Sequence, residues 1–252
     1  MFDEILHSLR KTRLGSLDHG GVEQAGSAAA LFAGHFDGIT TVGEEFGGSH
    51  LGLGVMDNLA GEIVSIDGKT WAIPSSGVPR LTSYKEKIAF GVSAHGGMRH
   101  RLKIPAGVDT EGLTEAVDRA LDELHADHEE IVAALRIQGT FTNVTLRTVH
   151  QPDFPGESLG EVIDDEIRFV FDRWEGTIIG FRYPDHSSGS TIPGLHLHGI
   201  DKHLQSGGHV RNATIAEVRA ELWLDHLHIH DQSNHSDSTP IDFTRYEGKV
   251  PG

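Results

Sequence analysis

Three histidines near residue 200 have a spacing that suits a metal ion. His196 and His198 are separated by one residue, and His209 follows shortly after, directly behind Gly207-Gly208. Alternate side chains of a β-strand share a face, so the first two imidazoles would point the same way and a neighbouring strand could supply the third. Three neutral imidazoles leave a coordination position open, as a catalytic metal requires. The sequence therefore predicts a catalytic site for zinc or another divalent metal.

The spacing has a simpler explanation, because the chain contains 18 histidines and some His-x-His pairs arise by chance on solvated strands. Glycines on both sides of the motif favour the metal site, since they allow the backbone of a hairpin to bend or approach closely. A second run, His226, His228 and His230, lies on one strand and would spread over about 13 Å. We interpret that run as an exposed face.

Composition limits the classes of partner and ligand. The formal charge of −16 disfavours nucleic acid and anionic membranes, so we expect neither as a partner. The chain has no cysteine, so a metal would be held by His, Asp or Glu. The first residues lack the pattern of a signal peptide, and no segment is long and apolar enough to cross a membrane. We expect a cytoplasmic protein.

Periodicity predicts a mixed α/β (α+β) fold. We expect a loosely ordered arm at 1–25, an N-terminal α/β subdomain with a mixed sheet and helices at 26–150, and a C-terminal, mainly antiparallel β subdomain with the metal ligands at 151–252. The boundary is placed at Pro152 and Pro155. The clearest helix begins at Thr110, where apolar residues recur with helical spacing. Further helical stretches are expected at 27–36, 41–46 and 127–135, a polar loop at 94–101, and separate strands at 210–215 and 218–230.

Several motifs, in order along most of the chain, resemble the bacterial acetolactate decarboxylase family. The matching segments are Phe36-Asp37-Gly38-Ile39-Thr40, Leu51-Gly52-Leu53-Gly54, Gly61-Glu62, Ile66-Asp67-Gly68-Lys69, Gly139-Thr140-Phe141, Arg147-Thr148-Val149, Gly176-Thr177-Ile178-Ile179-Gly180-Phe181-Arg182, Pro193-Gly194-Leu195-His196-Leu197-His198 and Gly207-Gly208-His209-Val210.

The resemblance implies a role for each matching residue. His196, His198 and His209 would bind zinc, Glu62 and Glu247 would be catalytic carboxylates, and Arg147 would face the substrate. The substrate would be a small 2-hydroxy-3-keto acid, 2-acetolactate. It would lose carbon dioxide through a metal-stabilised enediolate, which a carboxylic acid protonates to give acetoin, without an organic cofactor. The family also suggests a homodimer.

Other interpretations of these residues stay open. By spacing alone, Glu62 could be an exposed strand carboxylate, Arg147 a surface arginine and Glu247 an ordinary tail residue; Arg211 competes with Arg147 for the substrate carboxylate. The chain departs from the family at Val55, where a threonine is usual, at Ala60, and in the segment that follows Phe90. The missing hydroxyl at Val55 leaves substrate preference and stereochemical course open.

Two other functions compete with the decarboxylase. A cupin-like metal oxygenase also uses His-x-His strands, but it requires a glutamate where this chain has Lys202 and His203. A non-catalytic, histidine-rich metal-binding protein would need neither Glu62 nor Arg147, and it would bind several ions per chain.

Overall fold

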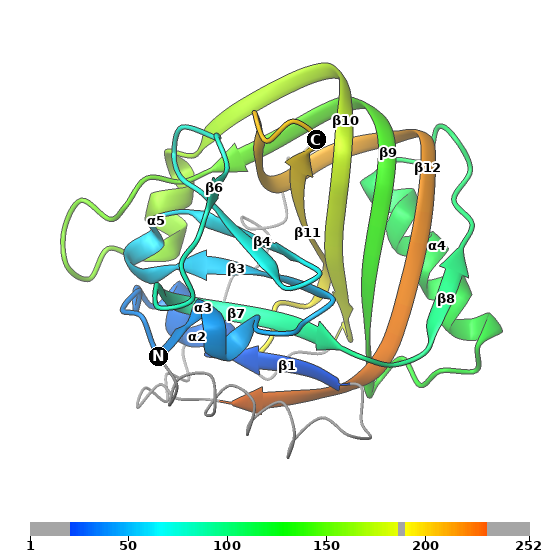
Figure 1. Ribbon diagram of the computed structural model, residues 1–252, viewed down its shortest axis with the longest axis horizontal. Coiled ribbons are helices and arrows are strands. Elements are labelled where there is room, and N and C mark those ends of the chain that lie inside the picture. Colours follow the sequence, from blue (N-terminus) through cyan, green and yellow to red (C-terminus); the bar gives the residue numbers. More distant parts are fainter. Residues whose placement is uncertain (1–20, 186–189, 231–252) are drawn as a thin grey trace, which may run out of the picture.

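Strands dominate the computed structural model, which describes residues 21–185 and 190–230. Within these residues twelve strands join in one hydrogen-bonded sheet; ten follow one order, while β2 pairs with β7 and β8 with β12 at its sides. Figure 1 shows the arrangement. The strands are β1 (Gly21–Ala25), β2 (Thr40–Thr41), β3 (Leu51–Met56), β4 (Glu62–Ile66), β5 (Lys69–Ile73), β6 (Arg80–Leu81), β7 (Lys87–His95), β8 (Arg99–Leu102), β9 (Ile131–Thr148), β10 (Ile167–Tyr183), β11 (Gly194–Asp201) and β12 (Gly207–His230). The helices are α2 (Ala28–Phe32), α3 (Val42–Glu45), α4 (Thr110–Glu123) and α5 (Leu159–Asp164), with a 3₁₀ turn η1 at Asp57–Leu59.

Four long strands close into a ring. The order runs β11, β10, β9, β12, and an additional antiparallel pairing joins β12 back to β11. Buried apolar side chains of the ring strands pack together with Leu113, Val117 and Leu121 of α4. Because side chains of a strand alternate between its faces, the neighbours of the ring's core residues point away from that core. Leu197 belongs to the core, so His196 and His198 point to the other side.

The remaining strands extend the sheet beyond the ring. β1 pairs in parallel with β12 and in antiparallel with β7, and the order continues through β3, β4, β5 and β6. Every other pairing in the described part of the chain is antiparallel. A second core, which includes Leu53, Val64, Ile179 and Phe181, lies between this extension and the ring. The face of β11 that carries the histidines is therefore turned toward β4.

Two helix starts have the caps that their sequences suggest. The side chain of Asp109 accepts a hydrogen bond from Gly112 N at the start of α4. Ser158 and Glu161 form a reciprocal capping box at the start of α5, in which each side chain accepts from the other residue's backbone N–H. These contacts satisfy N–H groups that a helix leaves without an intrahelical partner. α5 packs with α2 and with Val55 and Val149 in a third apolar cluster.

The mixed fold class with a mainly antiparallel second half is confirmed, as is the helix at Thr110. Three local predictions were wrong. The stretch 127–135 is not helical, because β9 begins at Ile131 and its first residues are covered on both faces, which removes the alternation typical of strands. The loop expected at 94–101 contains the end of β7 and β8. The strands 210–215 and 218–230 are one strand, β12, with bulges.

The domain boundaries remain predictions, with one local correction. Residues 1–20 of the expected arm lie outside the described residues, but Gly21–Ala25 form β1, which is held between β7 and β12. Val22 and Ala25 are buried, which explains why this end of the arm is ordered as a strand. The sheet also crosses the expected boundary, since β9 pairs with β10 and β12. Among the described helices, none has the length and apolarity to cross a membrane.

Candidate metal centre and active site

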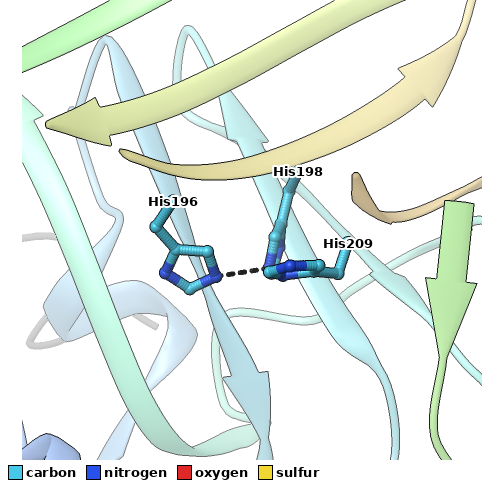
Figure 2. A group of neighbouring side chains, drawn as sticks. All are labelled: His196, His198 and His209. Atoms are coloured by element: carbon cyan, nitrogen blue, oxygen red, sulfur yellow. Dashed lines mark hydrogen bonds between the residues drawn. The ribbon is translucent and has the colours of Figure 1, made fainter. Parts of the chain in front are cut away.

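The structure brings the three motif histidines together on β11 and β12 (Figure 2). His198 lies directly opposite His209 in the pairing of these strands. His196 is two residues before His198 on β11, so its side chain points to the same face of the strand. Their ligand nitrogens are all within 4.8 Å of one another, and the Nε2 atoms of His196 and His198 are 3.1 Å apart. Two nitrogens bound to one tetrahedral zinc ion are about 3.3 Å apart, from Zn–N distances of 2.0–2.1 Å. The group is therefore already arranged for a single ion.

The chemistry of the donor set also fits a divalent metal. All three rings are buried, and burial is the largest cause that lowers the pKa of each from its ordinary value of 6.5, well below it for His196 and His209. Neutral imidazole is the form that binds a metal. Nδ1 of His198 lies 2.8 Å from the carbonyl oxygen of Ile63, which can only accept, so this nitrogen donates and Nε2 remains available as the ligand.

A buried carboxylate and a buried guanidinium border the histidines. Glu62 begins β4, and its Oε2 is 3.5 Å from Nε2 of His198. Arg147, near the end of β9, donates from Nη1 to Oε1 of Glu62 over 2.9 Å. Arg147 also lies opposite His209 in the pairing of β9 with β12. Four strands, β4, β9, β11 and β12, therefore bring a carboxylate, a cation and three imidazoles close together.

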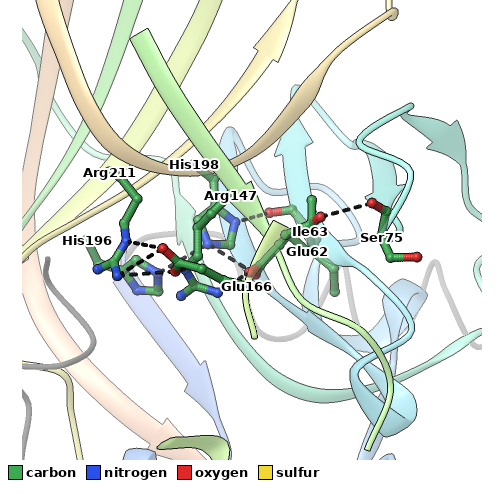
Figure 3. A network of polar contacts seen from close by, with 9 residues as sticks. Glu62, Ile63, Ser75, Arg147, Glu166, His196, His198 and Arg211 are labelled. Carbon is green, nitrogen blue, oxygen red and sulfur yellow. Dashed lines mark hydrogen bonds and ion pairs between the residues drawn. The ribbon is translucent and has the colours of Figure 1, made fainter. Parts of the chain in front are cut away.

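A second carboxylate, Glu166, was not identified from the sequence. It follows α5 and precedes β10, and its side chain is only 5% exposed. Figure 3 shows it beside Arg147 and Arg211. Oε2 is 3.5 Å from Nε of Arg147 and 3.1 Å from Nη2 of Arg211, while Oε1 is 2.5 Å from Nε of Arg168. Glu166 lies outside the regular strand and helix patterns and belongs to no recognisable sequence motif. Its contacts arise only in the fold, where β9, β10 and β12 each bring one arginine to its carboxylate.

Arg211, the rival for the substrate carboxylate, is thus engaged with Glu166. Its Nε and Nη2 donate to Oε1 of Glu166 over 3.3 and 3.2 Å. Burial lowers the pKa of Arg211 from its ordinary value, and the charge of Glu166 opposes this effect. Arg147 is the arginine that reaches Glu62 beside the histidines. The geometry therefore favours Arg147 over Arg211 as the cation nearest the candidate metal.

The other residues named from the sequence are placed as follows. Glu247 lies outside the described residues. Val55 is buried and lies opposite Glu62 in the pairing of β3 with β4, on the wall of the site. His226, His228 and His230 are exposed at the end of β12, and none belongs to the group of potential metal ligands found in the described ranges.

Sequence comparison yields one consistent family. A sequence model of the family described as Alpha-acetolactate decarboxylase matches residues 22–237. The chain is 32% identical over 207 residues to an alpha-acetolactate decarboxylase of Methylococcus capsulatus, which covers 80% of this chain and 77% of the relative. It is 28% identical over 189 residues to the alpha-acetolactate decarboxylase of Klebsiella aerogenes, an alignment that covers 75% of this chain and 71% of the relative.

Solved structures share the architecture. The crystal structure of alpha-acetolactate decarboxylase from Bacillus subtilis strain 168 superposes with a TM-score of 0.74 at 25% identity, covering 88% of this chain and 93% of that one. The acetolactate decarboxylase from Bacillus subtilis subspecies spizizenii gives a TM-score of 0.77 at 24% identity, covering 91% of this chain and 100% of that one. At this level of identity the similarity demonstrates a shared fold.

Proposed function

The chain belongs to the alpha-acetolactate decarboxylase family, and from this premise we propose that it converts 2-acetolactate to acetoin and carbon dioxide. The observation that carries the proposal is the contact of Arg147 with Glu62 beside three converging histidines. A buried cation, a carboxylate and an open metal position are the groups that loss of carbon dioxide from a 3-keto acid requires.

We propose zinc as the ion, held by His196, His198 and His209. When bound, the metal supplies a Lewis acid that polarises the ketone and offsets the negative charge that develops on its oxygen. Three histidines are the ligand set of known catalytic zinc sites, and they leave room for substrate oxygens. No organic cofactor is needed, because the ketone of the substrate itself accepts the electron pair.

Arg147 would orient the substrate. Its planar guanidinium can hold a carboxylate by paired hydrogen bonds, and its position beside His209 places that carboxylate next to the metal ligands. The bond between the carboxylate carbon and C2 then breaks, its electron pair forms a C2–C3 double bond, and the former ketone oxygen carries the charge. Carbon dioxide leaves at the guanidinium.

Glu62 would manage the proton that completes the reaction. C2 must take up one proton to give acetoin, and a carboxyl group can deliver it only from within hydrogen-bond reach. Oε2 of Glu62 is 3.5 Å from Nε2 of His198, so this oxygen borders the place where C2 would lie. Glu247 stays a prediction as the second carboxylate.

Metal removal and reconstitution test the proposal. Purified protein is stripped with a chelator, reloaded with zinc, and incubated with racemic 2-acetolactate while acetoin, dissolved oxygen and bound zinc are measured. We expect acetoin only from the reloaded protein, with one zinc per chain and no oxygen uptake. Oxygen consumption would indicate the oxygenase, whereas several ions per chain without acetoin would indicate a metal-binding protein. The homodimer and the cytoplasmic location remain predictions.

A further inference from the structure

Glu166 connects the arginine nearest the metal ligands to two arginines farther from them. Its carboxylate is in ion-pair contact with Arg147 of β9 and Arg211 of β12 (Figure 3). It also contacts Arg168 of β10. The side chains of Glu166, Arg147 and Arg211 are 5%, 2% and 12% exposed, whereas that of Arg168 is 59% exposed. The contacts with Arg147 and Arg211 are therefore the ones shielded from water, where charge interactions are strongest.

Glu166 is itself held in place from both sides along the chain. α5 starts at the capping box of Ser158 and Glu161, and its Val162 and Ile163 are buried. Glu166 N then donates to the carbonyl oxygen of Ile163 over 3.0 Å, and β10 begins at the next residue. The carboxylate thus sits at a fixed junction between a helix and a strand, and it can serve as a rigid support.

Arg147 meets a carboxylate at two different points of its guanidinium, through a hydrogen bond to Glu62 and through an ion-pair contact of 3.5 Å with Glu166. Nη1 donates to Glu62, which faces the histidines, and Nε lies beside Glu166, away from them. The hydrogen bond to Glu62 places one nitrogen of the planar group and does not by itself define the orientation of the plane. The charge of a second anion on the Nε edge favours one orientation of the plane, and the plane decides whether a substrate carboxylate can be bound by paired hydrogen bonds.

We infer that Glu166 is a positioning residue that sets the orientation of Arg147 toward the substrate and spaces it from the like charge of Arg211. This role rests on the proposed function of Arg147, through which Glu166 would act on the substrate. Removing its charge would take away the carboxylate that Arg147 and Arg211 share, so the repulsion between these two buried cations would be less well balanced. Arg147 would then turn away from the orientation that the reaction needs.

A double-mutant cycle tests the inference. Glu166→Gln keeps the shape but removes the charge, and Asp165→Asn makes the same change at the exposed residue before it. We expect kcat for acetoin formation to fall on the order of 10- to 100-fold in Glu166→Gln, with a smaller change in KM, unchanged zinc content and no effect in Asp165→Asn. In an Arg147→Lys background the same substitution should cost little more, because the group that it positions is already gone. Equal losses in both backgrounds, or a fully active Glu166→Gln, would overturn the inference.

The position of Arg147 is a readout that does not depend on turnover. In a crystal structure of the Glu166→Gln variant we expect the guanidinium plane of Arg147 to turn about its contact with Glu62, so that Nε moves away from residue 166, and an unchanged plane would contradict the inference. If the wild-type protein makes no acetoin, the proposed function fails and this structure still decides the role of Glu166. If Glu166→Gln does not fold, Glu166→Asp keeps the charge and withdraws it by one methylene, and the same cycle and structure then decide.

Discussion

At the scale of single residues, Arg147 depends on its shape as well as its charge. It contacts Glu62 through Nη1 and Glu166 through Nε, so two edges of the guanidinium are in use. Lysine would preserve the charge but offers a single ammonium group that cannot replace this arrangement. Replacing Arg147 with lysine therefore tests whether the substrate carboxylate is bound by paired hydrogen bonds or by charge alone.

We expect Arg147→Lys to lower kcat for acetoin formation on the order of 10²-fold, because a transition-state contact with paired donors is lost. Zinc content, measured by atomic emission, should stay at one per chain, since no histidine changes. Arg80→Lys serves as a control, because Arg80 is half exposed in an ion pair with Glu86 far from the histidines in sequence and strand order. A fully active Arg147→Lys enzyme would move the assignment to Arg211.

The carboxyl group of Glu62 can be separated from its hydrogen-bonding shape. Glu62→Gln keeps an oxygen that can accept from Arg147 but removes the group that carries a proton. Turnover should then drop by roughly 10²-fold or more, while zinc still binds. Acetoin assays and zinc analysis of the same sample measure both. Loss of zinc with the activity would indicate that Glu62 acts chiefly as a ligand, contrary to the proposed role.

At the scale of elements, the close pairing of β12 with β9 determines how near His209 lies to Arg147. Gly208 precedes His209 with φ of +140°, and a Cβ at this position would lie 2.4 Å from the carbonyl oxygen of Arg147. Only glycine allows the two strands to approach this closely. The conformation therefore sets His209 and Arg147 side by side.

We expect Gly208→Ala to lower the free energy of unfolding by about 1–3 kcal/mol through backbone strain, and to reduce zinc affinity as well. Urea unfolding and a zinc competition titration measure the two effects. Gly156→Ala is the control: φ is +89°, but a Cβ there meets nothing within 4 Å, so it tests the strain without the clash and without any effect on zinc. Unchanged zinc affinity in Gly208→Ala would refute the link between the strand approach and the site.

A helix or strand could be predicted from the sequence where one of its faces is buried and the other is exposed to solvent. The helix α4 shows this pattern, with Leu113, Val117 and Leu121 on its buried side. The start of β9 does not, because Val132 and Ala134 enter one core while Ala133 and Leu135 enter another. A strand covered on both faces has lost the alternation that distinguishes it from a helix, and the sequence alone could not resolve it.

At the scale of the whole molecule, the histidine motif could be found because its residues are near each other in sequence. The positions of Glu62 and Arg147, 85 residues apart, became visible only through resemblance to a family. Glu166 could be found by neither route, because it matters only once β9, β10 and β12 converge. Motifs within one hairpin are readable from sequence, whereas contacts between distant strands require the fold.

Burial of the histidines should make the stability of the metal-free protein depend on pH. Burial lowers the pKa of His196 and His209 below 6.5 in the folded state, so the unfolded chain binds more protons once the pH falls below about that value. The free energy of unfolding should therefore decrease as the pH is lowered from 7.5 to 5.5. Urea titrations measure it. A His196→Gln/His209→Gln variant should depend less on pH, and an equal slope in both proteins would refute this explanation.

The placement of all three proposed metal ligands on the paired strands β11 and β12 has a consequence for the order in which the protein assembles. These ligands need only a short loop to close, whereas Ile63 reaches His198 across 135 residues. Local contacts form before distant ones, so the hairpin can capture zinc while β4 is still undocked. Zinc should then accelerate refolding from urea, as followed by stopped-flow fluorescence, and should have no such effect on His209→Ala. An ion acquired in this way would act as a nucleus for folding before it takes part in any reaction.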